Sequence, residues 1–363
     1  MSEGEQLYDD EPREYDAILV VSFGGPEGPD DVLPFLDNVF RGLPVREETK
    51  AKIAERYALF GGVSPINAQT REFIAALRAE LDARGPALPI YWGNRNWHPY
   101  LAEAFEKMSR DGVRRVLAYV TSVFSSYSSC RKYRENLYEA AQTVPNPPVV
   151  DRLRSPFNHP LFIEAVAGRV TEALNRLPPE RRDGAPLLFT AHSLPESMAR
   201  RSPYEAQLRE ACRLVGDALE HQRWLLVYQS NNASYGGEPW LGPDIAEALV
   251  DLAKEGFEDV VVAPIGFVSD HLEVVLDLDR EAAAVAREHG LNFVRAATVG
   301  THPAYVSMVR DLICERMMPN PVRRALGTLG PAHDYCPSDC CASGRPGPLR
   351  PTLGGAPAAS PAS

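Results

Sequence analysis

The sequence has fewer cationic than anionic side chains, 38 Lys and Arg against 49 Asp and Glu, which gives a formal net charge of −11. Phosphate recognition needs clustered cations, so this balance argues against nucleic acid as a partner. The chain also lacks an apolar run near the roughly 20 residues that a transmembrane helix needs. Residues 1–14 are acidic and polar, unlike a secretory or transit peptide. We therefore expect a cytoplasmic protein without a transmembrane segment.

Cysteine is scarce as well, with six residues among 363. In a chain of this size and expected compartment, cysteines are core residues, metal ligands or redox groups rather than a disulfide framework. Cys212 shares an apolar helical stripe with Leu208 and Val215, which predicts a core position. Cys314 is also expected to be packed. The other four are Cys130, Cys336, Cys340 and Cys341.

The composition that is present, 44% apolar and 24% charged, is that of a globular protein, and the length suits two domains. Short apolar runs that suit buried strands alternate with helical patterns, which predicts an α/β fold with parallel sheets. Polar loops follow four of these runs, which end at Val21, Thr121, Ala191 and Ile265. Ligands bind outside the carboxyl ends of strands in such sheets, so two facing sheets would gather these loops around one cleft.

The loop at residues 121–129 carries six hydroxyl side chains beside Phe124 and Tyr127. These hydroxyls are too many to be buried together in a core. Two interpretations remain open, a polar loop with a helix N-cap and a wall that lines a ligand site.

His192 directly follows a buried strand, and Pro195 prevents the strand ladder from extending further. A histidine at this place is either a hydrogen-bonded structural residue or a base at the floor of a cleft, with a pKa suited to proton transfer. A second candidate segment at the end of another strand, residues 269–273, favours the base.

Glu273, Asp277 and Glu281 stand four residues apart, so a helix would align them in one row. Like charges at that spacing repel by roughly a few tenths of a kcal/mol per pair. The row is either a solvated helix face or a path that a cation visits. Four residues overshoot one α-helical turn by about 40°, so we predict a π-type widening near Glu273 that aligns the carboxylates better.

These motifs together resemble the ferrochelatases, enzymes that insert ferrous iron into a porphyrin. The matching segments, in order along the chain, are residues 22–27, 61–67, 93–97, 126–130, 190–195, 264–267 and 269–273. The resemblance covers about residues 16–317. It implies an α/β, chelatase-like fold with two Rossmann-like domains, each with a parallel sheet flanked by helices.

The expected domain organisation follows from this resemblance and from the composition of the C-terminus. The N-terminal domain is expected at 15–155 plus about 300–320, and the C-terminal domain at 156–299. A cysteine-bearing extension is expected at 321–342. The tail at 343–363 is mostly Pro, Gly, Ala and Ser, so we expect it to be disordered.

The resemblance also implies the roles of site residues. His192 matches the family's metal ligand and proton acceptor, and Glu273 matches its paired carboxylate, so both are expected to be catalytic and to bind the Fe²⁺ substrate. Asp277 and Glu281 match an outer acidic row that passes cations in or protons out. The expected porphyrin contacts are Phe23, Arg41, Ser64 and Tyr133, with Arg46 as the alternative to Arg41 for a propionate.

The C-terminal cysteines resemble those of cluster-bearing ferrochelatases, which use an internal cysteine as the fourth ligand. On that resemblance, a [2Fe–2S] cluster is expected on Cys130, Cys336, Cys340 and Cys341. The Cys-x3-Cys-Cys spacing departs from the Cys-x2-Cys-x4-Cys of animal enzymes, so zinc and free thiols remain open alternatives. The expected role of the cluster is to fasten the C-terminal extension.

The forms of two motifs, at residues 22–29 and 127–130, are most similar to those of actinobacterial-type enzymes that metallate coproporphyrin III. The expected reaction of this lyase is therefore coproporphyrin III to Fe-coproporphyrin III in haem biosynthesis. The alternatives are protoporphyrin IX as substrate, another metal–tetrapyrrole chelation such as cobalt into sirohydrochlorin, and a non-catalytic haem carrier. Expected partners are the porphyrin, ferrous iron and, transiently, neighbouring enzymes of the haem pathway.

Overall fold

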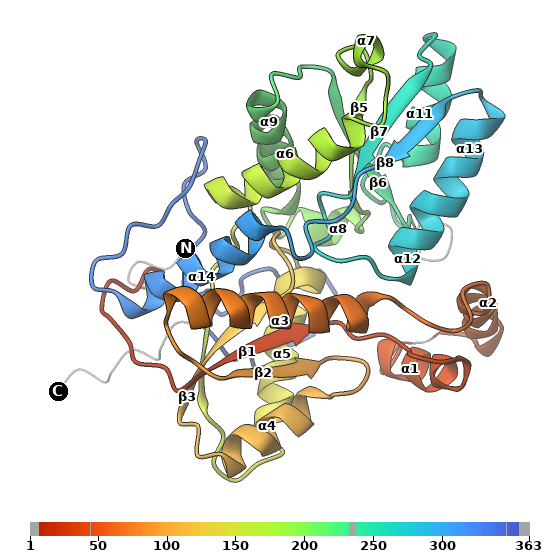
Figure 1. Ribbon diagram of the computed structural model, residues 1–363. Coiled ribbons are helices and arrows are strands. Elements are labelled where there is room, and N and C mark those ends of the chain that lie inside the picture. Colours follow the sequence, from red (N-terminus) through yellow and green to blue (C-terminus); the bar gives the residue numbers. More distant parts are fainter. Residues whose placement is uncertain (1–6, 44, 232–236, 346, 356–363) are drawn as a thin grey trace.

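Two four-stranded parallel sheets organise the chain, one in each half of the sequence (Figure 1). The computed structural model describes residues 7–43, 45–231, 237–345 and 347–355. The first sheet, in the order β2-β1-β3-β4, contains β1 (Ala17–Ser22), β2 (Ile90–Asn94), β3 (Arg115–Val120) and β4 (Val149–Arg152). The second sheet, in the order β6-β5-β7-β8, contains β5 (Leu187–His192), β6 (Trp224–Gln229), β7 (Asp259–Ala263) and β8 (Asn292–Arg295).

Helices cover both faces of each sheet. Those of the first half are α3 (Ile66–Arg84), α4 (Leu101–Arg110) and α5 (Lys132–Ala141). Those of the second half are α6 (Pro160–Leu174), α9 (Tyr204–Ala218), α11 (Ile245–Lys254) and α13 (Ala283–Glu288). The remaining elements are η1 (Pro29–Asp31), α1 (Val32–Val39), α2 (Glu47–Ala58), η2 (Tyr127–Arg131), α7 (Pro179–Arg182), α8 (Glu196–Ala199), α12 (Leu272–Val274), η3 (Val275–Ala282) and α14 (Pro303–Met317).

Strand β1 shows why the sequence folds this way. All its residues are buried, and its side chains alternate between two helix-covered faces of the sheet. Leu19 and Val21 pack in one core cluster with α4 and α5, whereas Ile18 and Val20 pack in a second cluster with α3. The predicted α/β fold with parallel sheets is therefore confirmed.

Helix α14 joins the two halves, because it packs against both α3 and α6. The core cluster at this junction contains side chains from both halves, among them Phe73, Phe189 and Ile313. A large apolar junction of this kind holds the two sheets in one relative position. We propose the domain division expected from the sequence, 15–155 plus about 300–320 and 156–299, with α14 as the element in contact with both halves.

The N-terminal residues lie against the segment that carries the C-terminal cysteines. The backbone nitrogens of Asp334 and Tyr335 donate to the carbonyl oxygen of Leu7 at 2.9 and 3.0 Å. The buried carboxylate of Asp9 accepts a hydrogen bond from the Tyr335 hydroxyl at 2.5 Å and lies 3.3 Å from the guanidinium of Arg316. Residues 7–9 thus fasten the cysteine-bearing extension to α14.

The tail that was expected to be disordered from residue 343 is described up to residue 355 with one gap, and this part makes defined contacts. Arg131 Nη2 donates to the carbonyl oxygen of Arg350 at 3.2 Å, and Arg134 Nε donates to that of Leu353 at 2.9 Å. Both arginines are buried and need acceptors, a requirement that composition does not reveal. The expectation of disorder is therefore wrong for the described part of the tail. Residues 346 and 356–363 lie outside the described structure.

Within the described residues, none of the helices combines the length and the apolar character that crossing a lipid bilayer requires.

Candidate active site

His192 is the last residue of β5, between β6 and β7 in the second sheet. Its Nδ1 lies 2.5 Å from the carbonyl oxygen of Ser193. A carbonyl oxygen only accepts, so Nδ1 carries the hydrogen and Nε2 keeps its lone pair. The side chain is 31% exposed. The imidazole therefore offers a nitrogen that accepts protons or binds metal.

Glu273 of α12 faces this nitrogen, with its Oε2 3.8 Å from His192 Nε2. Polar contacts position the loop before α12. Asp270 accepts hydrogen bonds from Arg295 at 2.9 and 3.3 Å, and its backbone nitrogen donates to Gln69 Oε1, in α3, at 2.8 Å. The structure thus brings together the two residues that the sequence predicts to be catalytic.

Gly266 lets the loop after β7 approach the end of β5. A Cβ on this residue would lie 2.7 Å from the Cα of Ala191, and its backbone nitrogen donates to the Thr190 carbonyl at 3.0 Å. The same loop carries His271, whose ring packs edge-on against Phe267 at 5.1 Å. Burial lowers the pKa of His271, which favours the neutral form of this second imidazole.

The acidic row continues from Glu273 into η3, a π-helical turn that carries Asp277 and Glu281. The prediction of a π-type widening in this stretch is therefore confirmed. Such turns arise where a side chain must be re-aimed, and they are frequent at functional sites.

Asp277 is the buried member of the row. Its Oδ2 accepts a hydrogen bond from the Ser230 hydroxyl and lies 3.4 Å from Gln229 Nε2. Burial, followed by the charge of Glu273, raises the pKa of Asp277 to about 6, while Ser230 and Arg56 act in the opposite direction. A carboxyl group with this pKa is suited to passing either a proton or a cation.

A cation from the other half of the chain already faces the row. Arg56 Nη2, from α2, lies 2.9 Å from Glu281 Oε1 and 3.3 Å from Asp277 Oδ1. Sequence reasoning missed Arg56, because α2 shows only that it is a polar helix and not which surface it faces. The one available signal was the repulsion within the row, which requires a nearby positive charge.

Phe23 and Tyr133, two of the expected porphyrin contacts, both have their rings close to Arg95. The Arg95 guanidinium is 5.3 Å from the centroid of the Phe23 ring and 4.7 Å from that of Tyr133. Its Nε donates to Asn136 Oδ1 at 2.8 Å, and no carboxylate of the described chain forms an ion pair with it. Arg95 therefore keeps donors for an anionic ligand group. Sequence reasoning assigned it no role, although it belongs to the matching segment 93–97.

Ser64 and Arg41, the other two expected porphyrin contacts, are placed differently. Ser64 is buried. Gly25 packs closely against it, since a Cβ on Gly25 would lie 2.7 Å from the Ser64 Cβ. Arg41 is exposed after α1, and its guanidinium binds the side chain of Asn38. Among the described residues, no hydrogen bond or ion pair links Arg41 to the other expected porphyrin contacts.

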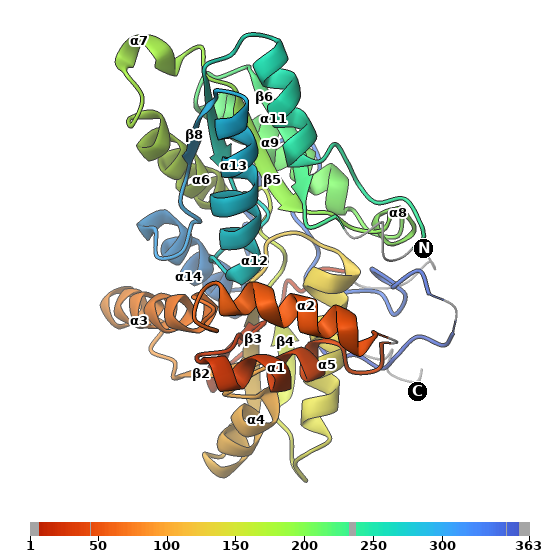
Figure 2. The same ribbon diagram turned by 90° about the vertical axis from the view of Figure 1, so that its right-hand side faces the viewer.

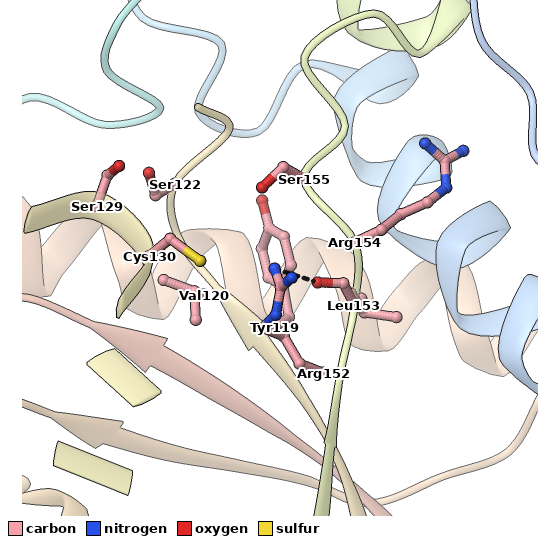
Figure 3. Close-up of a pocket in the computed structure, with 9 residues that line it drawn as sticks. All are labelled: Tyr119, Val120, Ser122, Ser129, Cys130, Arg152, Leu153, Arg154 and Ser155. Atoms are coloured by element: carbon pink, nitrogen blue, oxygen red, sulfur yellow. Dashed lines mark hydrogen bonds between the residues drawn. The ribbon is translucent and has the colours of Figure 1, made fainter. Parts of the chain in front are cut away.

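The loop at 121–129 caps the following π-helical turn. The Ser126 hydroxyl accepts from the backbone nitrogen of Ser129 at 3.1 Å, and the Ser129 hydroxyl accepts from that of Ser126 at 2.9 Å. The N-cap interpretation is therefore confirmed for these two residues. Ser129 also lines a small cavity with Cys130 and Arg152, which places the polar loop beside the cysteine site (Figure 3).

The four cysteines expected to bind metal lie close together. The thiols of Cys130 and Cys336 are hydrogen-bonded, and this bond holds the pKa of Cys336 well below its usual value. Cys340 Sγ lies 3.6 Å from Cys341 Sγ. Ligand atoms of His333, Cys336 and Cys340 all lie within 4.8 Å of one another, and sequence reasoning missed this histidine.

Buried guanidinium groups surround these cysteines. Arg152 Nη2 donates to Cys336 Sγ at 3.0 Å, and Arg131 Nη1 donates to the carbonyl oxygen of Cys340 at 3.0 Å. Arg131 is paired with the buried Glu135 at 3.4 Å, whereas Arg152 has no carboxylate partner in the described part of the chain. Burial alone would lower the pKa of Arg152, but the charges of the cysteines raise it. The hydrogen bond from Arg152 therefore favours negative charge on the sulfur of Cys336.

The fold is that of a chelatase. A solved structure of SirB from Bacillus subtilis with Fe³⁺ resembles it with a TM-score of 0.52 and 14% sequence identity, over 82% of this chain and 96% of that chain. At this identity the likeness concerns the fold alone, two parallel sheets flanked by helices.

The sequence comparisons are more specific. Residues 15–317 match the ferrochelatase family. The ferrochelatase of Rhodopirellula baltica is 52% identical over 332 residues, which cover 90% of this chain and 93% of that protein. The coproporphyrin III ferrochelatase of Streptomyces griseus is 47% identical over 361 residues, which cover 93% and 96%. This chain belongs to the ferrochelatase family, which confirms the predicted enzyme class, a lyase that inserts iron into a porphyrin in haem biosynthesis.

Proposed function

We propose that this enzyme inserts Fe²⁺ into coproporphyrin III and that His192 and Glu273 are the side chains that meet the metal. The observation that carries the assignment is the distance of 3.8 Å between His192 Nε2 and Glu273 Oε2. Both side chains are partly exposed. One imidazole and one carboxylate suit Fe²⁺ and leave its other coordination positions open for exchange.

The reaction exchanges two pyrrole N–H protons for one Fe²⁺ ion and releases two protons and the water bound to the metal. His192 Nε2 is the proton acceptor, because Nδ1–H is held by the Ser193 carbonyl. Glu273 offers oxygen ligands to the incoming ion. The protons leave along Asp277, whose pKa of about 6 allows it to gain and lose a proton near neutral pH.

Coproporphyrin III is proposed as the substrate because several relatives of high identity are named for it. Its four propionates carry more negative charge than the two of protoporphyrin IX. Arg95 is the best-placed cation for one of them, because it lies close to the rings of Phe23 and Tyr133 and has no carboxylate partner among the described residues. Phe23 contributes a ring for stacking and no axial ligand.

A comparison of the two porphyrins tests this assignment. We expect kcat/KM to be at least about tenfold higher for coproporphyrin III than for protoporphyrin IX, a difference of about 1.4 kcal/mol. The variant Arg95→Gln is expected to reduce this ratio, and Arg209→Gln, on the exposed side of α9, is the control. Equal or reversed kcat/KM values would contradict the substrate assignment.

We further propose a [2Fe–2S] cluster on Cys130, Cys336, Cys340 and Cys341. Charge supports an anionic centre at this place. The buried guanidiniums of Arg131, Arg134 and Arg152 have Glu135 as their one buried carboxylate partner among the described residues. A cluster of two ferric ions, two sulfides and four thiolates is a dianion and offsets this positive charge, whereas four neutral thiols do not.

A tetrathiolate zinc ion would carry the same charge, so chemistry must separate the two metal centres. We expect protein purified without oxygen to show visible absorbance and acid-labile sulfide. Bound zinc instead of iron, without visible absorbance or acid-labile sulfide, would contradict the cluster. The proposal of an anionic metal centre at this site would remain. The cluster's proposed role is to fasten the extension to η2.

The cytoplasm is the proposed compartment. None of the six cysteines forms a disulfide in the described structure, which suits a reducing environment.

A further inference from the structure

The outer carboxylates of the acidic row have a partner that their own helix does not provide. A single nitrogen, Nη2 of Arg56, lies 2.9 Å from Glu281 Oε1 and 3.3 Å from Asp277 Oδ1. Arg56 belongs to α2, in the opposite half of the chain from η3, and Figure 2 shows α2 below α12. One arginine therefore bridges the two carboxylates across the junction between the halves.

We propose that Arg56 is a displaceable counter-cation, which occupies the acidic row between turnovers and which an incoming divalent metal ion must displace. This inference rests on the proposed function, in which Asp277 and Glu281 lead the ion toward Glu273. Three carboxylates in a row repel one another and need positive charge nearby. Arg56 supplies that charge until the metal ion does.

The ion pairs of the two outer carboxylates support this role. Within the described chain, the ion pairs of Asp277 and Glu281 are those with Arg56. Among the described residues, Arg56 is therefore the cation that balances the charge of these two carboxylates.

The contact is built to be exchanged. The Arg56 side chain is 44% exposed, so water and salt screen its ion pairs. No residue of α2 is buried, so Arg56 can move aside without opening the core. A second contact joins the segment after α2 to η3, because the guanidinium of Arg280 lies 5.5 Å from the centroid of the Phe60 ring. This contact remains when the guanidinium of Arg56 moves away from the row.

A resident guanidinium also makes the row selective for charge. A divalent ion gains more than an arginine from several oxygen ligands, whereas a monovalent ion does not. The row therefore exchanges its arginine for divalent ions and excludes potassium and sodium. It also releases a divalent ion more readily, because Arg56 competes for the same oxygens.

The test measures Mn²⁺ binding to the chelator-treated, porphyrin-free enzyme, by calorimetry or by the spin-resonance signal of free Mn²⁺. In Arg56→Gln, one positive charge next to the row is lost, and we expect about tenfold tighter Mn²⁺ binding. The matched control is Arg209→Gln, which removes a similarly exposed arginine paired with Glu205 on α9. We expect this control to leave Mn²⁺ affinity unchanged.

The variant Asp277→Asn distinguishes two hypotheses, that Arg56 is a counter-cation and that the acidic row binds the metal ion. Weaker Mn²⁺ binding in Asp277→Asn, with no change in Arg56→Gln, would keep the path and reject the counter-cation. No change in either variant would show that the row does not bind the ion and would reject both. Iron insertion by the unmodified enzyme is measured separately, so the proposed activity is tested on its own.

Discussion

The Nε2 nitrogen of His192 and the Oε2 oxygen of Glu273 lie 3.8 Å apart, close enough for one metal ion to contact both. The first side chain ends β5, and the second follows the loop after β7, the neighbouring strand of the same sheet. Their proximity is therefore a consequence of strand order. Because both side chains are partly exposed, each residue can be replaced without disturbing the core.

Replacing His192 tests the proposed proton acceptor. In His192→Ala, we expect the rate of Fe²⁺ insertion to fall at least about 100-fold, because the variant lacks the Nε2 lone pair that is proposed to accept the pyrrole protons. Porphyrin binding, followed by fluorescence quenching, is expected to be retained. The exposed His289 provides the control variant His289→Ala. Normal turnover in His192→Ala would remove the central role assigned to this residue.

Replacing Glu273 tests the carboxylate ligand. Glu273→Gln keeps the shape of the side chain and removes its charge, so we expect kcat/KM for Fe²⁺ to fall about tenfold or more with an unchanged KM for the porphyrin. Initial rates at varied Fe²⁺ check this. Glu288→Gln, on an exposed position of α13, is the control. An effect confined to the porphyrin KM would speak against metal binding by Glu273.

Arg152 is expected to control retention of the metal centre. In Arg152→Gln, the cysteine site loses a buried positive charge and its hydrogen bond to Cys336 Sγ. We therefore expect most of the bound iron and acid-labile sulfide to be lost. Arg152→Lys, which keeps the charge, is expected to retain more than Arg152→Gln. Arg115→Gln, at the partly exposed partner of Asp151, is the control. Equal metal content in all variants would contradict the role of charge.

His159 is expected to make stability depend on pH. Burial, and then the charges of Arg154 and Arg324, lower its pKa to about 3. In the unfolded chain, the histidine pKa is near 6.5, so as the pH falls the unfolded state binds this proton before the folded state does. The contribution of His159 to the free energy of unfolding is therefore complete above about pH 6.5 and decreases as the pH drops toward 3. Between pH 7.5 and 5 the loss from this residue is about 2 kcal/mol.

Denaturant unfolding at both pH values measures this effect. His159→Asn keeps a side chain that caps the N-terminus of α6 and removes the titrating group, so its loss of stability is expected to be about 2 kcal/mol smaller. The same loss in both proteins would contradict the assignment.

The ion pair between Arg154 and Glu315 is expected to be structural. Two hydrogen bonds join them at 2.7 and 2.8 Å, and the side chains are 1% and 9% exposed. Glu315→Gln leaves a buried guanidinium without a counter-charge, so we expect about 3–5 kcal/mol of destabilisation in denaturant unfolding. The double variant Arg154→Met/Glu315→Met is expected to recover much of that loss. A loss below about 1 kcal/mol in Glu315→Gln would indicate that Arg154 finds another partner.

The sequence predicted what depends on local pattern. Buried apolar strands and the segments at their ends place His192 and Glu273, and the spacing of the acidic residues predicts the π-helical turn. It did not predict a role for Arg56, His333 or Arg95. Their contacts depend on which polar surface of one element meets another, and polar helix faces carry no periodic signal that identifies their partner.

The C-terminal tail illustrates the same limit. Its composition predicts disorder, because it offers few apolar side chains to bury. In the described part, carbonyl oxygens of Arg350 and Leu353 instead satisfy the buried donors of Arg131 and Arg134. Backbone acceptors are available in any sequence, so this mode of attachment leaves no trace in composition.

The contact between Asp9 and the cysteine-bearing extension has a consequence for folding. Asp9 donates its backbone N–H to the Asp334 carboxylate, 325 positions further along the chain, so this contact can form only once the chain has been synthesised as far as Asp334. Contacts of such long range close late, after the local strand and helix pairs have formed. We therefore expect a metal centre on Cys336 to assemble only after the two sheets have formed.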